Sequence, residues 1–187
     1  MKKEILIVAL LVLTTAILRI VNAELHMYNM VPVAALGIFS GSVLTNKKWA
    51  YMIPLTAMFL SDVGLNLFTS TPGFYGISQF VNYLALGLVT LLGTTLVNRK
   101  AINILGYTLG GSMIFFLVSN FGTFLQGYYG YQFEGFINCY VMALPFYKSE
   151  FSTVIFMNSF LGDIIFSVIA FGTFYLATLP KLTLKKA

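Results

Sequence analysis

Three ionisable side chains, Arg19, Asp62 and Asp163, lie inside long runs of apolar residues. Asp62 occurs in the stretch TAMFLSDVGLNLF, and Asn66 follows it by four residues, so the two side chains would share one face of a helix. A charged side chain at the centre of a bilayer costs about 2.5–3.5 kcal/mol on insertion scales, and it usually faces a partner or a watery cavity. Groups in such positions commonly serve solute binding, ion binding or proton transfer.

The composition places these residues in a membrane. Of the 187 residues, 58% are hydrophobic and 9% are charged, whereas soluble domains carry roughly 25% charged residues. The formal net charge is +5, but the basic residues form short clusters between apolar runs and no patch with interleaved aromatic residues. The expected partner is therefore the lipid bilayer, and nucleic acid is excluded.

Apolar runs of about 20 residues are long enough to cross the hydrocarbon core. The sequence predicts an all-α polytopic membrane protein, residues 1–187 forming one domain with about six spans and both termini in the cytoplasm (N-in/C-in). The predicted spans are residues 5–21, 30–44, 49–68, 77–97, 101–119 and 151–176, and an aromatic outer segment covers residues 120–150. The basic clusters, Lys2/Lys3, Lys47/Lys48, Arg99/Lys100 and Lys181/Lys185/Lys186, then all lie on the cytoplasmic side, as the positive-inside rule requires.

Two features of this topology have alternative interpretations. The first span resembles a cleavable secretory signal, with a basic start, an apolar centre and Val-Asn-Ala before Glu24. Its length and Arg19 favour a retained helix, whereas cleavage would leave five spans and a mature chain that begins near Glu24. The matching stretches FLSD (59–62) and FLGD (160–163) would fit an inverted repeat of three spans per half, although chance is the better explanation of two four-residue matches in a sequence so rich in Phe and Leu.

The polar residues can be compared by their depth within the predicted spans. At 1.5 Å per residue, Arg19 and Asp62 lie about 21 Å and 20 Å from the cytoplasmic ends of their runs, in the outer half of the core. Asp163 lies about 18 Å from the outer end of its run, nearer the middle. The sequence predicts a polar pocket open to the outside, and its predicted substrate-binding residues are Arg19, Asp62, Asn66, Asn82, Asn158 and Asp163.

A purely structural interpretation of the same residues stays open. Arg19 would then pair with Asp62 to hold two helices together, and the asparagines would bond neighbouring helices at about 0.6 kcal/mol each. Asp163 would then be a protonated carboxyl group hydrogen-bonded to a neighbouring helix.

The sequence does not favour an enzyme. The chain has one histidine, His26, and one cysteine, Cys139, so a metal site shared by histidines and an intrachain disulfide are both excluded. It has no HExxH motif and no glycine-rich phosphate loop, and we expect no cofactor. An intramembrane enzyme using Asp62 and Asp163 remains an alternative, although neither aspartate lies in a Tyr-Asp or Gly-Leu-Gly-Asp context.

Three stretches carry a family resemblance: NMVPVAALGIFSGSVL, IPLTAMFLSD and VSNFGTFLQGYYGYQFEGFINCYVMALPFYKSEF. They resemble a bacterial family of uncharacterised small integral membrane proteins classed as putative transport proteins. More distantly, the chain is similar to the S components of energy-coupling factor (ECF) vitamin transporters, which are six-helix proteins with a ligand pocket near the outer face. The Ala-x-x-x-Ala docking motif common in their first helix is absent, because Ala9 and Ala16 are seven residues apart.

The resemblance implies a multi-pass protein of the bacterial cytoplasmic (inner) membrane that binds a small, vitamin- or cofactor-like solute from outside, with an ECF S-component-like bundle. An energising ATPase and transmembrane module is a further implied partner, and proton coupling through Asp163 is an alternative energy source. A non-transporting membrane scaffold or assembly subunit, in which the buried polar residues only lock helices together, is the alternative function.

Overall fold

A computed structural model describes residues 2–25, 32–144 and 158–178, with side chains from residue 10 onward and, in the last stretch, from residue 160. Seven α-helices and no strand occur in these ranges. The helices are α1 (Lys2–Glu24), α2 (Val33–Val43), α3 (Lys47–Phe68), α4 (Ile77–Thr94), α5 (Ala101–Leu125), α6 (Phe133–Ala143) and α7 (Asn158–Thr178).

Four stretches of these helices are long and apolar enough to cross a membrane: Lys47–Phe68, Ile77–Thr94, Ala101–Leu125 and Phe160–Thr178. The length and composition of these helices confirm the prediction of an all-helical membrane protein. The fifth predicted span, residues 101–119, continues as α5 to Leu125. The last predicted span begins at residue 151, so its first seven residues (151–157) lie outside the described part of the chain.

The short apolar helix α2 occupies the centre of the bundle. Its residues from Ala34 to Ser42 are all buried, and α2 packs against α1, α3, α4, α5 and α7. With 11 residues it is about 16 Å long, which is half the thickness of a hydrocarbon core. The second predicted span is thus a short helix surrounded by protein.

Close packing between α2 and α4 depends on glycine. A Cβ atom added to Gly41 would lie 2.4 Å from the backbone oxygen of Thr90, and one added to Gly93 would lie 2.8 Å from Cα of Ile38. The Gly37–Gly41 pattern therefore permits close approach, as small-xxx-small patterns do in membrane helices. The Gly106–Gly110 pattern on α5 does not, because a Cβ at Gly106 would meet no atom within 4 Å.

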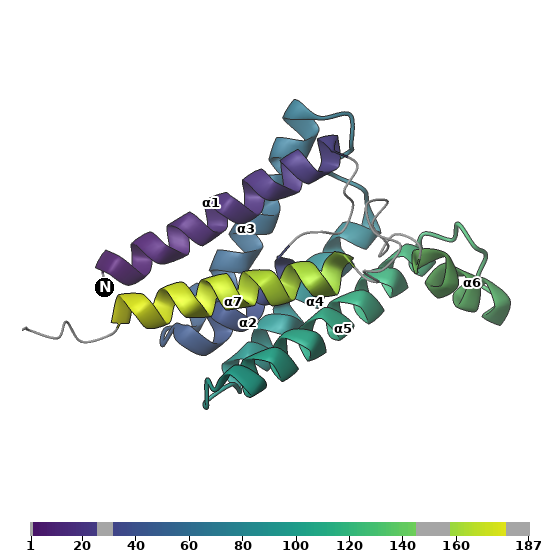
Figure 1. Cartoon of the computed structure of the whole chain (residues 1–187). Coiled ribbons are helices and arrows are strands. Elements are labelled where there is room, and N and C mark those ends of the chain that lie inside the picture. Colours follow the sequence, from purple (N-terminus) through teal and green to yellow (C-terminus); the bar gives the residue numbers. More distant parts are fainter. Residues whose placement is uncertain (1, 26–31, 145–157, 179–187) are drawn as a thin grey trace, which may run out of the picture.

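The start of α1 and the end of α7 lie at the same end of the bundle, and α6 projects from the opposite end (Figure 1). The helix α6 forms within the aromatic outer segment, at Phe133–Ala143. The ring of Phe136 lies 5.4 Å from Phe124 of α5, and the Tyr140 hydroxyl donates a hydrogen bond to the carbonyl oxygen of Leu117 at 2.7 Å. These contacts hold α6 against the last turns of α5.

Candidate functional site

An ion pair between α1 and α3 forms the centre of the candidate site. The Arg19 guanidinium donates a hydrogen bond to the Asp62 carboxylate, and the same nitrogen lies 2.6 Å from the hydroxyl oxygen of Ser61 and 3.4 Å from the carbonyl oxygen of Met58. The Asp62 side chain is fully buried, and 15% of the Arg19 side chain is exposed. Burial of both charges is tolerated because each meets a partner of opposite sign.

The second carboxylate oxygen of Asp62 receives two hydrogen bonds from α4. Gln79 Nε2 donates to it at 3.0 Å, and the Tyr83 hydroxyl donates to it at 2.6 Å. Gln79 and Tyr83 are four residues apart, so they lie on the same face of α4. Three helices therefore meet at one carboxylate.

The loop between α3 and α4, residues 69–76, covers this cluster. A Cβ atom added to Gly73 would lie only 1.8 Å from the backbone oxygen of Asp62, so only glycine permits the loop to lie so close to α3. The cavity beside Arg19 has a volume of about 10 Å³, which is about the smallest space that holds one water molecule. The cluster is closed in this arrangement.

A second polar group lies at the same end of α4. Asn82 Nδ2 donates a hydrogen bond to the Tyr75 hydroxyl at 2.8 Å, and Gln126 Nε2 donates to the Tyr75 carbonyl oxygen at 2.8 Å. The Oδ1 atom of Asn82 is buried without a hydrogen-bond donor among the described residues. A buried acceptor without a donor costs free energy, so this atom could receive a bond from a molecule that enters between the loop and α4.

Asp163 belongs to a different site, at the N-terminus of α2. Its carboxylate accepts a hydrogen bond from the backbone N–H of Ala35 at 2.9 Å and one from the Ser112 hydroxyl at 2.7 Å. The N-cap residue of α2, Pro32, makes no side-chain cap hydrogen bond. Asp163 therefore supplies from α7 the cap that α2 lacks, where a negative charge is favoured by the helix dipole.

Of the six residues that were predicted to form one pocket, the structure describes the side chains of five, and these five do not converge on one site. Arg19 and Asp62 are in direct contact, and Asn82 lies on α4 but bonds to Tyr75. Asn66 is exposed at the end of α3, so the predicted polar stripe of Asp62 and Asn66 does not converge on one site. Asp163 caps α2, and the side chain of Asn158 lies outside the described residues.

Three members of the cluster were not anticipated from the sequence: Ser61, Gln79 and Tyr83. The four-residue spacing of Gln79 and Tyr83 was the available signal, because it places two hydrogen-bonding groups on one face of an otherwise apolar helix. No group of three or more His, Cys, Asp or Glu side chains that could hold a metal ion occurs among the residues that the structure describes.

Comparisons with known proteins give one assignment. No curated protein and no solved structure matches the chain. A family of unknown function, DUF6580, matches residues 1–185. Since this match covers almost the whole chain, the protein belongs to the DUF6580 family.

Proposed function

We propose that the protein is a membrane transport protein that binds a small, vitamin- or cofactor-like solute at the Arg19–Asp62 cluster. The observation that carries the proposal is the buried ion pair within long apolar helices, which shares its carboxylate with Gln79 and Tyr83. Ionisable groups inside membrane helices are costly, and they commonly mark solute and ion pathways.

The chemistry of the cluster indicates the class of solute. Asp62 accepts bonds from Gln79 and Tyr83, and donor groups of a solute can take the place of these two. Arg19 has five N–H donors, which suit an anionic or carbonyl group of the same solute. The expected solute therefore carries both hydrogen-bond donors and an acidic or strongly polar acceptor.

Solute entry requires the loop at residues 69–76 to move. The loop lies directly against α3 at Gly73, and the space beside Arg19 is far too small for a solute. Gln79 connects the two parts, because its Nε2 lies 3.0 Å from Asp62 Oδ2 and 3.5 Å from the carbonyl oxygen of Gly73. A solute that takes the Gln79 bond to Asp62 would thus loosen the loop as it binds.

The wider proposal is a six-span bundle similar to an S component, with both termini in the cytoplasm, in the cytoplasmic membrane of a bacterium. The start of α1 and the end of α7 lie at the same end of the bundle (Figure 1), which supports the part of this proposal that puts both termini on one side of the membrane. A partner ATPase and transmembrane module would supply the energy. The short helix α2, whose residues from Ala34 to Ser42 are buried inside the protein, is similar to the half-helices that transporters place at their binding sites.

A membrane scaffold or assembly subunit is the second candidate function, and one observation favours it. Both carboxylate oxygens of Asp62 already accept hydrogen bonds from the protein itself. A cluster satisfied in this way can lock α1, α3 and α4 together without any solute.

Mass spectrometry of molecules that co-purify with the protein separates these two functions. We expect the wild-type protein to release a defined small molecule that Asp62→Asn lacks. Asn66→Ala, which alters an exposed residue on the same helix, should retain the molecule. Circular dichroism should show equal helicity for all three proteins.

A wild-type protein that carries no small molecule, combined with an Asp62→Asn variant that unfolds, would instead establish the scaffold function. If Asp62→Asn unfolds although the wild type carries a solute, Tyr83→Phe is the second variant. It removes one donor to Asp62 but leaves the ion pair intact, and we expect it to change solute affinity without loss of helicity.

A further inference from the structure

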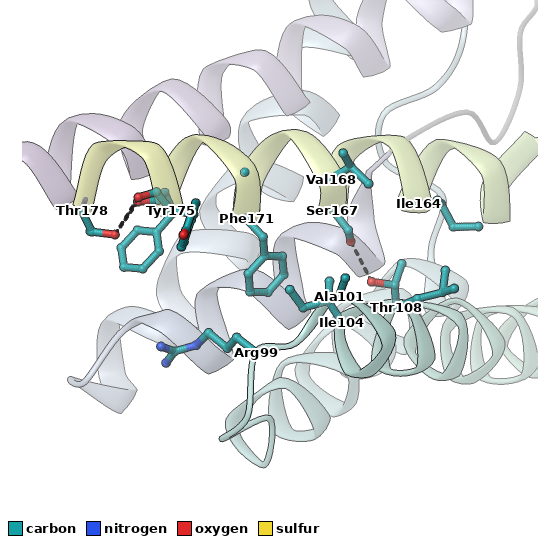
Figure 2. A pocket seen from close by; sticks show the side chains of 13 residues that line it. Arg99, Ala101, Ile104, Thr108, Ile164, Ser167, Val168, Phe171, Tyr175 and Thr178 are labelled. Carbon is teal, nitrogen blue, oxygen red and sulfur yellow. Dashed lines mark hydrogen bonds between the residues drawn. The ribbon is translucent and has the colours of Figure 1, made fainter. Parts of the chain in front are cut away.

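A cavity of about 520 Å³ lies between α5 and α7, apart from the Arg19–Asp62 cluster. Ile104, Val168 and Phe171 are among the apolar side chains that line it (Figure 2). Thr108 and Ser167 line its floor, where their hydroxyl oxygens lie 2.8 Å apart and bond to each other. Because these two hydroxyl groups bond to each other, the floor presents a mainly apolar surface to an incoming molecule.

One end of the cavity is cationic. Arg99 lines this end, next to the first residue of α5, Ala101 (Figure 2). The Arg99 guanidinium donates to the carbonyl oxygen of Ser42 at the end of α2. A guanidinium has five N–H donors in a planar fork that suits phosphate, so one bond to Ser42 leaves donors for an anion. The N-terminus of α5 adds a partial positive charge at the same end.

The cavity opens between two helices that are long and apolar enough to cross a membrane. Its rim residues Leu105, Val168 and Tyr175 are exposed, so in a bilayer this rim faces lipid. An acyl chain suits such an apolar groove, and a phosphate group suits its cationic end. This complementarity of charge and polarity describes an amphipathic molecule with one anionic head.

We propose that the groove between α5 and α7 is a binding site for an anionic phospholipid, with an acyl chain along the groove and the phosphate on Arg99. Basic pockets between membrane helices on the cytoplasmic side are known to bind lipid headgroups in this way. The bound lipid would bridge α5, α7 and, through Arg99, the end of α2. This site is independent of the proposed solute site.

The test measures lipid retention by native mass spectrometry. The full-length protein is purified in mild detergent with equal amounts of dioleoylphosphatidylglycerol, which is anionic, and dioleoylphosphatidylcholine, which is zwitterionic. We expect the wild type to retain the anionic lipid at least tenfold over the zwitterionic one. Arg99→Gln should lose this preference, and Lys100→Gln, a neighbouring basic residue outside the cavity lining, should keep it.

A second variant tests the groove without altering charge. Gly172 lines the cavity, and a Cβ at this position meets no atom within 4 Å, so the side chain of Gly172→Phe begins in open space and its ring would occupy the groove. We expect this variant to retain at least tenfold less lipid. Gly87→Phe on α4 is the matched control, because Gly87 is equally open and lies outside the cavity.

Two results would overturn the proposal. The first is a wild-type protein that retains both lipids equally or retains neither. Another occupant would then fill the groove: a second copy of the chain, residues 179–187 or the transported solute. The second is a folded Gly172→Phe variant that retains as much anionic lipid as Gly87→Phe.

Discussion

The Asp163 carboxylate on α7 lies 2.9 Å from the backbone nitrogen of Ala35, in the first turn of α2. Its other oxygen accepts a hydrogen bond from Ser112 on α5 at 2.7 Å. A helix start leaves its first N–H groups without intrahelical partners, and burial makes such groups costly. One side chain therefore joins three helices at the point where the central helix begins.

Replacement of Asp163 by alanine should destabilise the protein. The N–H of Ala35 and the hydroxyl of Ser112 would lose their shared hydrogen-bond acceptor, and we expect the free energy of unfolding to fall by about 1–3 kcal/mol. Chemical denaturation in detergent micelles, followed by circular dichroism, measures this change. Glu134→Ala, at an exposed acidic residue of α6, is the control, and an equal effect of both variants would contradict the capping role.

Two glycine-to-alanine substitutions should have opposite effects. Gly41→Ala places a Cβ 2.4 Å from the Thr90 oxygen, so we expect overpacking to cost about 1–3 kcal/mol. Gly106→Ala places its Cβ in open space, where alanine should stabilise the helix by roughly 0.5–1 kcal/mol relative to glycine. Thermal unfolding of the two variants under identical conditions tests this, and equal melting temperatures would show that α2 and α4 do not need this close approach.

The ion pair of Arg19 and Asp62 should show strong coupling in a double-mutant cycle. Arg19→Met leaves the buried carboxylate without its cation, which costs about 3–5 kcal/mol. Asp62→Leu removes the acceptor of Gln79 and Tyr83 as well. The double variant should lose less stability than the sum of the two single changes, measured as free energies of unfolding. Additive losses would mean that the two charges do not stabilise each other.

Cys139 on α6 should react slowly with thiol reagents. Its side chain is buried, and burial raises the pKa of the thiol, so a smaller fraction is thiolate at any given pH near or below that pKa. The rate of maleimide labelling of Cys139 should therefore still rise with pH in a range where the labelling rate of an ordinary cysteine no longer changes.

The comparison for this rate profile is Ser70→Cys in a Cys139→Ala background, because Ser70 is exposed in the loop between α3 and α4. We expect the introduced thiol to label faster at every pH and to reach its plateau at a lower pH. A Cys139 profile with the same inflection as that of the introduced cysteine would contradict the effect of burial.

Some helix boundaries agree with the sequence prediction, such as the end of α3 at Phe68, and others do not. The helices α4 and α5 begin at Ile77 and Ala101, as expected from the apolar runs that start there. The end of α5 was misplaced at residue 119 because Ser119 and Asn120 look like a polar boundary. In the structure both donate to the Phe116 carbonyl oxygen of their own helix, so the helix continues past them.

Depth along the helices identified the partners Arg19 and Asp62, because helical rise converts residue number directly into position. Depth alone did not locate Asp163, since its main partner is the backbone N–H of Ala35, which no inventory of side chains includes. The available signal was the start of α2 itself, where Pro32 offers no side-chain cap. A buried helix without a local cap needs an acceptor from elsewhere in the chain.

The two ends of α2 are held by residues far away in the sequence, and this has a consequence for biosynthesis. Asp163 accepts from the N–H of Ala35 in its first turn, and Arg99 donates to the carbonyl oxygen of Ser42 in its last turn, so each end of the helix receives the kind of partner that its free backbone groups need. Residues 33–43 leave the ribosome about 120 residues before Asp163 does. The central helix therefore reaches its final position only after the last helix has been synthesised.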